Sequence, residues 1–553
     1  MTIVQRRIGG IFALFFLLLL LAGGRTLYLG ALKGGSLRKA AATQQLTYET
    51  VPAQRGTITD RNGVDLAVSE PAQDISATPY LVKDPLAAAQ KLAPLLGKPQ
   101  GEVLRELSER SGFVYLSRAL PAKQAHEVMA LKLEGISGAP VMRRVYPRGT
   151  LAAQVLGAVG TEGNGLSGLE YSRNALLHGH AGERRVVSDA LGQPVSISEP
   201  HAEQSGTPVS LTLDANIQQR TEDVLGAVGR VFSPKDATAI VMNPQTGAIL
   251  AMANWPQVNL KDPSATSPED MENRAVSFDY EPGSTFKAVT VAGALQQHLV
   301  TPSTSFAIPD QIQVADRTIH DDTEHAEESL TTAQILAQSS NVGAIKIGAL
   351  EGSENFSKWV ERFGFGKATG VELPGEEIGQ VLPVSKYSGS SMGNLPIGQG
   401  ELVTPLQMAS VYAAIANGGI LRQPHIVQSV GGQPQAVPAG HRVISEATAA
   451  SLRQMLEGVL APGGTASEVS IPGYQLAGKT GTASKVEEST GEYSKSRYVA
   501  SFMGFAPASH PKLLTAVIVD EPQAGSIFGG TVAAPAFGQI MSFALPYLRI
   551  PPG

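Results

Sequence analysis

Ser284 and Lys287 are the two side chains of this 553-residue sequence whose types and spacing first suggest chemistry. They lie three positions apart in Glu281-Pro282-Gly283-Ser284-Thr285-Phe286-Lys287, which runs on into small and apolar residues. The Pro-Gly pair before such a run predicts the start of a buried helix, with both side chains on one face of its first turn. A serine becomes a nucleophile beside a base, and lysine is a base only when its pKa falls from about 10.4. Ser284 and Lys287 are therefore candidates for a nucleophile and its base.

Ser-x-x-Lys alone is a weak pattern, because the chain contains it three times. Ser36…Lys39 lies in a basic stretch after an apolar segment, and Ser509…Lys512 lies in a proline-flanked turn. Neither opens a run of Ala, Val and Leu as Ser284 does. Further groups must supply the rest of the chemistry if Ser284 is catalytic.

Ser339 and Asn341 follow a segment, residues 331–338, that reads as a helix. The Ser339 hydroxyl can relay a proton and the Asn341 amide can orient an acyl substrate. The alternative for this Ser-x-Asn pattern is a helix cap without any catalytic part.

Lys479-Thr480-Gly481-Thr482 lies in a predicted strand over residues 474–483. Lys479 and Thr480 offer a cation and a hydroxyl for a substrate carboxylate, and Gly481 lets a ligand approach the backbone. The alternative is a glycine that forms a turn in a polar loop.

The elements around these motifs predict an α+β domain. Strands are predicted over 209–213, 237–242, 248–252, 498–505 and 513–519, with a long helix over 215–228 and a mostly helical middle. Strands at both ends and helices between them favour an antiparallel sheet backed by helices.

The amino-terminal part reads as a membrane anchor and a spacer. After a short tail, residues 1–7, the apolar segment 8–32 can cross a bilayer, and a cleaved signal peptide ending near Ala22-Gly23-Gly24 is the alternative. Both readings carry the rest of the chain across the membrane. Residues 33–205 are predicted to form a non-catalytic mixed α/β pedestal. It contains an Asn62-Gly63 hairpin turn and a helix over 86–93, capped by Asp84 and ended by Pro94. Residues 206–553 would form the catalytic domain.

Composition excludes several classes of protein and site. The net charge of −6 and the lack of long Lys/Arg runs argue against a general nucleic-acid binder. With no cysteine, the chain has no disulfide, thiol nucleophile or Cys-ligated zinc. The cluster from His320 to His325 lacks metal-ligand spacing and is interpreted as a solvated acidic loop.

In this order, the three motifs resemble the signature of the penicillin-recognising serine enzymes. The chain as a whole is similar to the class B penicillin-binding proteins, which are monofunctional peptidoglycan DD-transpeptidases. Ser340 at the middle of the second motif suits this class. The resemblance extends over nearly the whole chain, to the segments Arg55–Gly63, Arg144–Gly149, Gly168–Glu170 and Gly398–Gln407. The stretch from Phe278 to Ser284 is closer to the septal, cell-division subgroup than to the elongation subgroup.

The resemblance implies a role for each motif residue. Ser284 would attack the penultimate D-alanyl carbonyl of a stem peptide, Lys287 would take its proton, and Ser339 and Asn341 would help proton transfer and hold the peptide. Lys479 and Thr480 would bind its carboxylate, and the N–H groups of Ser284 and Thr482 would form an oxyanion hole. An amine from a neighbouring stem would then complete the cross-link. β-Lactams would acylate Ser284, with no metal or cofactor required.

The resemblance also implies partners and a location. The catalytic domain would lie on the periplasmic side of the cytoplasmic membrane, acting on peptidoglycan stem peptides and lipid-linked precursors. A separate membrane glycosyltransferase and division proteins would be its partners. The alternatives are an elongation enzyme, a β-lactam sensor or β-lactamase, and a non-catalytic division scaffold.

Overall fold

The computed structural model describes residues 3–33, 35, 46–188, 194–261, 266–487 and 489–552. Ser36 and Lys39 lie outside the described residues. Contacts divide the chain into two compact units that alternate along the sequence. The first comprises Met1–Gln54, Pro71–Met142 and Gly179–Ser205, and the second comprises Arg55–Glu70, Arg143–His178 and Gly206–Gly553. The functional division at residue 206 remains a prediction.

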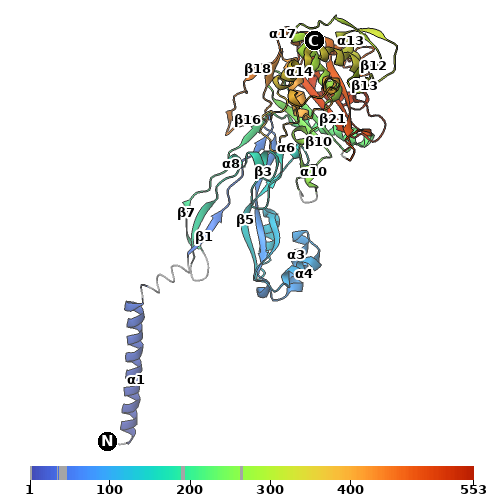
Figure 1. Ribbon diagram of the computed structural model, residues 1–553. Helices are drawn as coiled ribbons and strands as arrows, with labels where there is room; N and C mark the ends of the chain where they lie inside the picture. Colours follow the sequence, from blue (N-terminus) through green and yellow to red (C-terminus); the bar gives the residue numbers. More distant parts are fainter. Residues whose placement is uncertain are drawn as a thin grey trace. The chain divides into compact units, whose positions relative to one another are not determined.

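The first unit begins with helix α1 (Ile3–Leu27) and a π-helical turn, η1 (Tyr28–Leu32) (Figure 1). Within the described chain, its stretch Gln5–Ala31 is the one helical segment long and apolar enough to cross a membrane, with a mean hydropathy of 2.1. This segment coincides with the predicted anchor and is consistent with a single membrane pass.

A three-stranded sheet, one end of a seven-stranded sheet and several helices form the rest of the first unit. Strands β1 (Leu46–Val51), β6 (Gly182–Ser188) and β7 (Pro194–His201) pair antiparallel. The later part of β3 (Asp65–Ala77) pairs with β4 (Val114–Pro121), and β5 (Ile136–Val145) also pairs with β3. A separate apolar core lies between this second sheet and helices η2 (Pro79–Leu81), α3 (Pro85–Leu96), α4 (Gln100–Leu107) and α5 (Ala122–Ala130).

Helix α3 confirms the predicted start but not the predicted end. Asp84 caps it by accepting a hydrogen bond from Ala87 N at 3.0 Å, and Pro85 occupies its first position. Pro94 lies inside the helix, which continues to Leu96. Pro94 removes one backbone hydrogen bond, but the apolar face of the helix continues to Leu96 and is buried in the core. The helix ends at Gly97, whose φ of 66° is left-handed.

The second unit begins with the predicted hairpin. β2 (Ile58–Thr59) pairs with the start of β3, and Gly63 in the turn has a φ of 83°. β8 (Val209–Leu211), the predicted strand after residue 206, pairs with β2 and with β16 (Val427–Val430), which also pairs with β17 (Gln433–Pro434). The short helices here are α6 (Ala153–Leu156), α7 (Gly168–Ser172) and α8 (Asn174–Leu177).

A buried ion cluster fixes the beginning of this unit. Glu170 is fully buried and accepts from Arg55 Nε at 2.5 Å and from Arg144 Nε at 2.6 Å. Arg55 also donates to the carbonyl of Glu170 at 2.7 Å and to Asn174 Oδ1 at 2.8 Å. Buried charges persist only when paired and hydrogen-bonded in this way.

An antiparallel sheet of five strands forms the centre of the second unit. Figure 1 shows strands from distant parts of the sequence side by side in it. Their order is β10 (Ile249–Trp255), β9 (Asp236–Met242), β21 (Leu513–Asp520), β20 (Tyr493–Ala506) and β19 (Ala477–Val486). The motif strand β19 is therefore an edge of the sheet.

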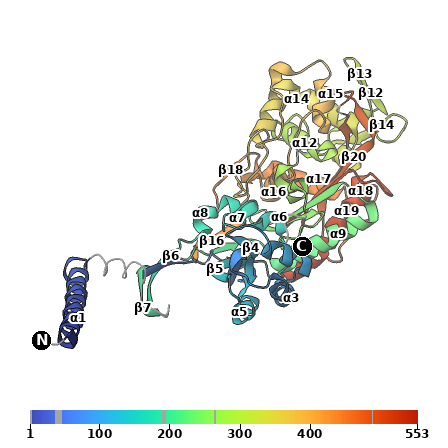
Figure 2. The ribbon, with the colours of Figure 1, turned by 90° about the horizontal axis from the view of Figure 1, so that it is seen from below.

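Helices cover both faces of this sheet (Figure 2). Alternate side chains of the strands pack against α9 (Ala215–Phe232) and α19 (Ala534–Tyr547) on one face. On the other face lie α11 (Arg274–Ser277), α12 (Lys287–Gln296), α16 (Pro405–Ala416) and α17 (Glu446–Glu457). The predicted α+β fold, an antiparallel sheet packed against helices, is confirmed.

The remaining elements lie around the second motif and at the rim of the unit. A 3₁₀ turn, η4 (Gly283–Phe286), precedes α12, and α13 (Thr332–Gln338) and α14 (Asn341–Arg362) flank Ser339 and Ser340. The others are α10 (Pro268–Met271), β11 (Ser305–Ile308), β12 (Gln311–Val314), β13 (Arg317–His320), β14 (Glu328–Thr331), η5 (Val384–Lys386), α15 (Ser391–Asn394), η6 (Leu395–Ile397), β15 (Ile420–Arg422), β18 (Gly440–Arg442) and α18 (Gly529–Val532).

Candidate active site

Ser284 lies in the 3₁₀ turn η4, and Lys287 is the first residue of α12. The expectation was an α-helical first turn. A 3₁₀ turn has three residues per turn, so positions 284 and 287 are eclipsed on one face. Gly283 permits the turn because its φ is 54° and a Cβ there would lie 3.1 Å from Ala483 Cβ. The predicted juxtaposition of the two side chains thus follows from the backbone.

Lys287 is fully buried and its amine connects the first motif to the second. Nζ donates to Ser339 O at 2.5 Å, to Ser339 Oγ at 3.2 Å and to Asn341 Oδ1 at 2.6 Å. Burial lowers the pKa of Lys287 to about 8, against the opposing charges of Asp322 and Asp321. About a tenth of the amine is therefore neutral at pH 7, far more than for an exposed lysine.

Ser339 and Ser340 form the sharp connection between α13 and α14. Ser339 ends α13 in a left-handed conformation, with a φ of 67° that is uncommon for a residue with a side chain. Ser340 caps α14, since its hydroxyl accepts from Gly343 N at 2.9 Å. The capping interpretation of this motif is thus correct for Ser340, while Ser339 and Asn341 point their polar groups at Lys287.

Lys479 brings the third motif to the same hydroxyl. Its Nζ donates to Ser339 Oγ at 2.9 Å and to Thr480 O at 3.1 Å, and the side chain is fully buried. Burial, and then the charge of Lys287, lower its pKa well below 10.5. Thr480 Oγ1 lies 2.6 Å from Thr465 Oγ1. A carboxylate arriving here would find a cation whose charged form it stabilises.

Gly481 lies within strand β19, which excludes the turn interpretation. A Cβ at this position would lie 2.3 Å from Ser501 Oγ, 2.9 Å from Thr285 Cγ2 and 3.1 Å from Pro282 O. Glycine is therefore required for the close approach of β19 to the turn η4, which contains Ser284. Thr482, the next residue, accepts a hydrogen bond from Gly529 N at its Oγ1, 3.1 Å away.

The structure thus brings Lys287, Ser339, Asn341 and Lys479 into direct contact, and places Ser284 one turn from Lys287. Within the described residues, Ser284 Oγ has no hydrogen-bond partner, and its residue is partly exposed. A free hydroxyl close to two buried amines that share the Ser339 hydroxyl is suited to acyl transfer.

Comparison with known proteins identifies the family. The penicillin-binding protein transpeptidase domain matches residues 237–542, more than half of the chain, and the penicillin-binding protein dimerisation domain matches residues 50–211. The chain belongs to the class B penicillin-binding proteins. Its activity is that of a peptidoglycan D,D-transpeptidase.

Relatives of this penicillin-binding protein match along most of their length. The penicillin-binding protein PbpB of Mycolicibacterium smegmatis is 33% identical, over 94% of this chain and 87% of its own. The peptidoglycan D,D-transpeptidase FtsI of Escherichia coli is 34% identical, over 98% and 90%. Penicillin-binding protein 3 of Mycobacterium tuberculosis, solved in complex with aztreonam, superposes with a TM-score of 0.72 at 30% identity, covering 91% of this chain and 98% of that one.

Asp321 belongs to the site of this penicillin-binding protein, although sequence reasoning assigned it to a solvated loop. Its side chain is only 8% exposed and accepts from Ser340 Oγ at 2.8 Å, from Val342 N at 3.0 Å and from Asn341 N. These hydrogen bonds fix the backbone of the second motif at the start of α14. The neighbouring Asp322 accepts from Asn341 Nδ2 at 3.3 Å. No sequence signal joins Asp321 to Ser340 and Asn341, because strand β14 and helix α13 lie between them in the chain.

The metal interpretation of His320 to His325 gains no support. Within the described residues, no group of three or more His, Asp or Glu side chains is arranged to hold a metal ion. His325 instead lies 3.2 Å from Asp321 Oδ2 through its Nε2.

Proposed function

We propose that this transpeptidase works through an acyl-enzyme on Ser284 and releases the terminal D-alanine of the donor stem peptide. The main support for this proposal is that Lys287 donates hydrogen bonds to Ser339 and Asn341. Lys287 itself lies one turn after Ser284, whose hydroxyl is free among the described residues. In the acylation step the Ser284 Oγ–carbonyl bond forms and the amide bond to the terminal D-alanine breaks. Lys287 takes the hydroxyl proton, and Ser339 relays a proton to the departing amine.

The developing oxyanion would be stabilised by the backbone N–H groups of Ser284 and Thr482. Their placement is supported by the close packing of η4 on edge strand β19, where every second N–H faces away from β20. Loss of one such donor typically costs about 3 kcal/mol of transition-state stabilisation. Lys479 and Thr480 hold the donor carboxylate, and an amine from a neighbouring stem then attacks the ester to form the cross-link.

β-Lactams would acylate Ser284 as mimics of the donor peptide. The proposed setting is septal wall synthesis, supported by the resemblance of the stretch from Phe278 to Ser284 and by the similarity to FtsI. The apolar helix α1 would keep the catalytic unit on the extracytoplasmic side of the membrane. A separate membrane glycosyltransferase would supply the glycan strands, and co-purification from detergent extracts of cells tests that partnership.

Labelling with a fluorescent penicillin tests the mechanism. A long-lived adduct is expected, and Ser284→Ala should abolish it. Ser509→Ala is the matched control, since Ser509 also precedes a lysine by three residues but lies exposed in the turn between β20 and β21. Rapid release of the label would indicate a β-lactamase. Absence of any adduct in a folded wild-type protein would indicate a non-catalytic scaffold.

A further inference from the structure

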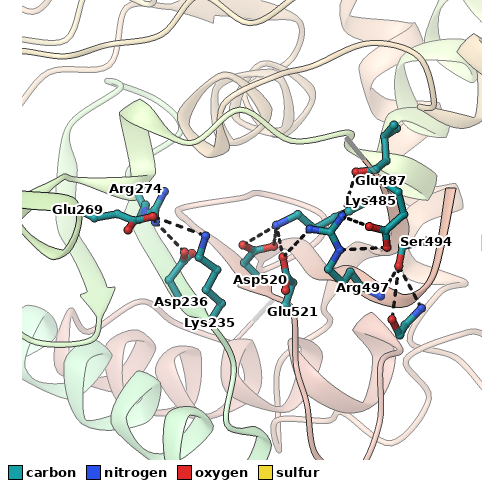
Figure 3. A network of polar contacts seen from close by, with 12 residues as sticks. Lys235, Asp236, Glu269, Arg274, Lys485, Glu487, Ser494, Arg497, Asp520 and Glu521 are labelled. Atoms are coloured by element: carbon teal, nitrogen blue, oxygen red, sulfur yellow. Dashed lines mark hydrogen bonds and ion pairs between the residues drawn. The ribbon is translucent and has the colours of Figure 1, made fainter. Parts of the chain in front are cut away.

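Lys485 lies on β19, two strands away from the carboxylates that bind its amine. Its Nζ donates to both carboxylate oxygens of Asp520 at 2.9 Å and to Glu521 Oε1 at 2.6 Å (Figure 3). Asp520 ends β21, and β20 lies between β21 and β19. The Lys485 side chain therefore crosses β20 and ties the edge strand to the middle of the sheet.

The Lys485 amine is bound next to a pair of acids, Asp236 and Asp520, that face each other across two adjacent strands. Asp236 on β9 lies directly opposite Asp520 on β21, and both are buried. Like charges at such a position destabilise a sheet, so each needs its own cation. Lys485 serves Asp520, and Arg274 Nη2 lies 3.0 Å from Asp236 Oδ2. Figure 3 shows the two acids with a cation on each side.

Lys485 also contacts the segment that leads into η4, the turn that contains the proposed nucleophile Ser284 and is called the nucleophile turn below. Its Nζ lies 5.8 Å from the centre of the Phe278 ring, and the Arg274 guanidinium lies 5.7 Å from the same centre. Phe278 in turn stacks on Tyr280, with ring centres 5.7 Å apart and planes within 5°. Both cations of the acid pair thus hold the Phe278 ring, six residues before Ser284.

The contacts between β19 and residues 278–285 follow one another along the strand. Gly481 lies against Thr285 and Pro282, and Ala483 lies against Gly283. These small residues permit close packing but provide no directional interaction. At Lys485 the pairing of β19 with β20 is irregular, since the register shifts between Ser484 and Val486. Pairing resumes at Val486, which lies opposite Tyr493, so Lys485 occupies the one irregular position of β19 and its side chain adds a directional contact there.

We propose that Lys485 is a positioning residue that braces the far end of β19 against the nucleophile turn. It holds the strand at the end opposite Lys479 and thereby aligns Thr482 N–H with Ser284. This inference rests on the proposed acylation of Ser284. An error of about 1 Å in such an alignment can cost on the order of 100-fold in rate without affecting binding of the substrate.

Stopped-flow acylation with a fluorescent penicillin separates an effect on binding from an effect on the reaction rate. It gives a non-covalent dissociation constant for the first and an acylation rate constant for the second. For Lys485→Met, which keeps the apolar stem, we expect acylation about 10- to 100-fold slower, with an unchanged dissociation constant. Lys485→Arg should restore most of the rate, since a guanidinium can bind both oxygens of Asp520. The rate constant, unlike the amplitude, does not depend on the folded fraction.

Lys235→Met is the matched control, because it removes another lysine of the same network at an exposed end, where Nζ lies 3.6 Å from Glu269. It should acylate at the wild-type rate. The proposal would be overturned if Lys485→Met acylated at the wild-type rate, or if only its dissociation constant changed. It would also be overturned if the acylation rate constant fell equally in Lys485→Met and Lys235→Met. A wild-type protein that forms no Ser284 adduct would instead overturn the proposed function.

Discussion

Lys287 and Lys479 donate to the same oxygen, Ser339 Oγ, at 3.2 Å and 2.9 Å. Two buried ammonium groups so close to each other cannot both remain charged at low cost. Burial lowers the pKa of each, and the charge of Lys287 further lowers the pKa of Lys479. The Ser339 hydroxyl thus links two amines that exist partly in the neutral form, which is the condition for relaying a proton.

The acylation rate constant should rise with pH and level off above about 8. Lys287 is a base only when neutral, and its pKa of about 8 places the rise there. Lys287→Ala should remove this rise and slow acylation on the order of 100- to 10,000-fold, with folding intact. Rate constants measured between about pH 6 and pH 10 check both expectations. Near-normal labelling of the alanine variant would remove Lys287 as the base.

Asp322→Asn should shift that rise to lower pH. The charge of Asp322 is the largest influence that raises the pKa of Lys287 against burial, so its removal lowers that pKa. Asparagine keeps an oxygen that can accept the 3.3 Å hydrogen bond from Asn341 Nδ2. The same pH series on the variant measures the shift, with Asp316→Asn in the exposed turn after β12 as the control. An unmoved profile would contradict the electrostatic account.

Local sequence patterns predicted the motif elements because each pattern reports on its own neighbours. The helix before Ser339 and the strands that form the five-stranded sheet were found in this way. Asp321 was missed because its role depends on contacts with Ser340 and Asn341, which follow an intervening strand and helix. No periodicity or turn chemistry marks such a contact.

The same limit applies to Pro94 and to the alternation of the two units. Proline usually ends a helix, yet α3 continues past Pro94 to Leu96, which is buried in the core of its unit. Residues 55–70 and 143–178 belong by contact to the unit of the transpeptidase motifs. The Arg55–Glu170–Arg144 ion cluster that joins these segments could be recognised as a resemblance, but its pairing required coordinates.

Gly481→Ala should slow acylation and destabilise the protein by about 1–3 kcal/mol. The added methyl would meet Ser501 Oγ and the backbone oxygen of Pro282, which can yield only if β19 moves from the nucleophile turn. Melting temperature and penicillin labelling check the two effects. Gly101→Ala is the control, because it lies in helix α4 with no atom within 4 Å of a new Cβ. Unchanged penicillin labelling of the Gly481→Ala variant would show that β19 can shift without disturbing Ser284.

Glu401→Gln should change how stability depends on pH. Glu401 is 1% exposed, and neither of its oxygens has a hydrogen-bond partner among the described residues. Burial raises the pKa of Glu401 to about 8, so the folded protein keeps a proton that the unfolded chain loses near pH 4.3. Stability contributed by this group is complete below about pH 4.3 and falls as pH rises toward 8, by up to about 1.4 kcal/mol per unit.

Glutamine carries no such proton, so the variant should gain on the wild type progressively between about pH 5 and pH 8, and the gain should then level off. Denaturant unfolding of both proteins across this range measures the difference. Glu354→Gln, an exposed residue of α14, should show no such trend. A constant difference between wild type and Glu401→Gln would mean that Glu401 is charged in the folded protein and has found a partner.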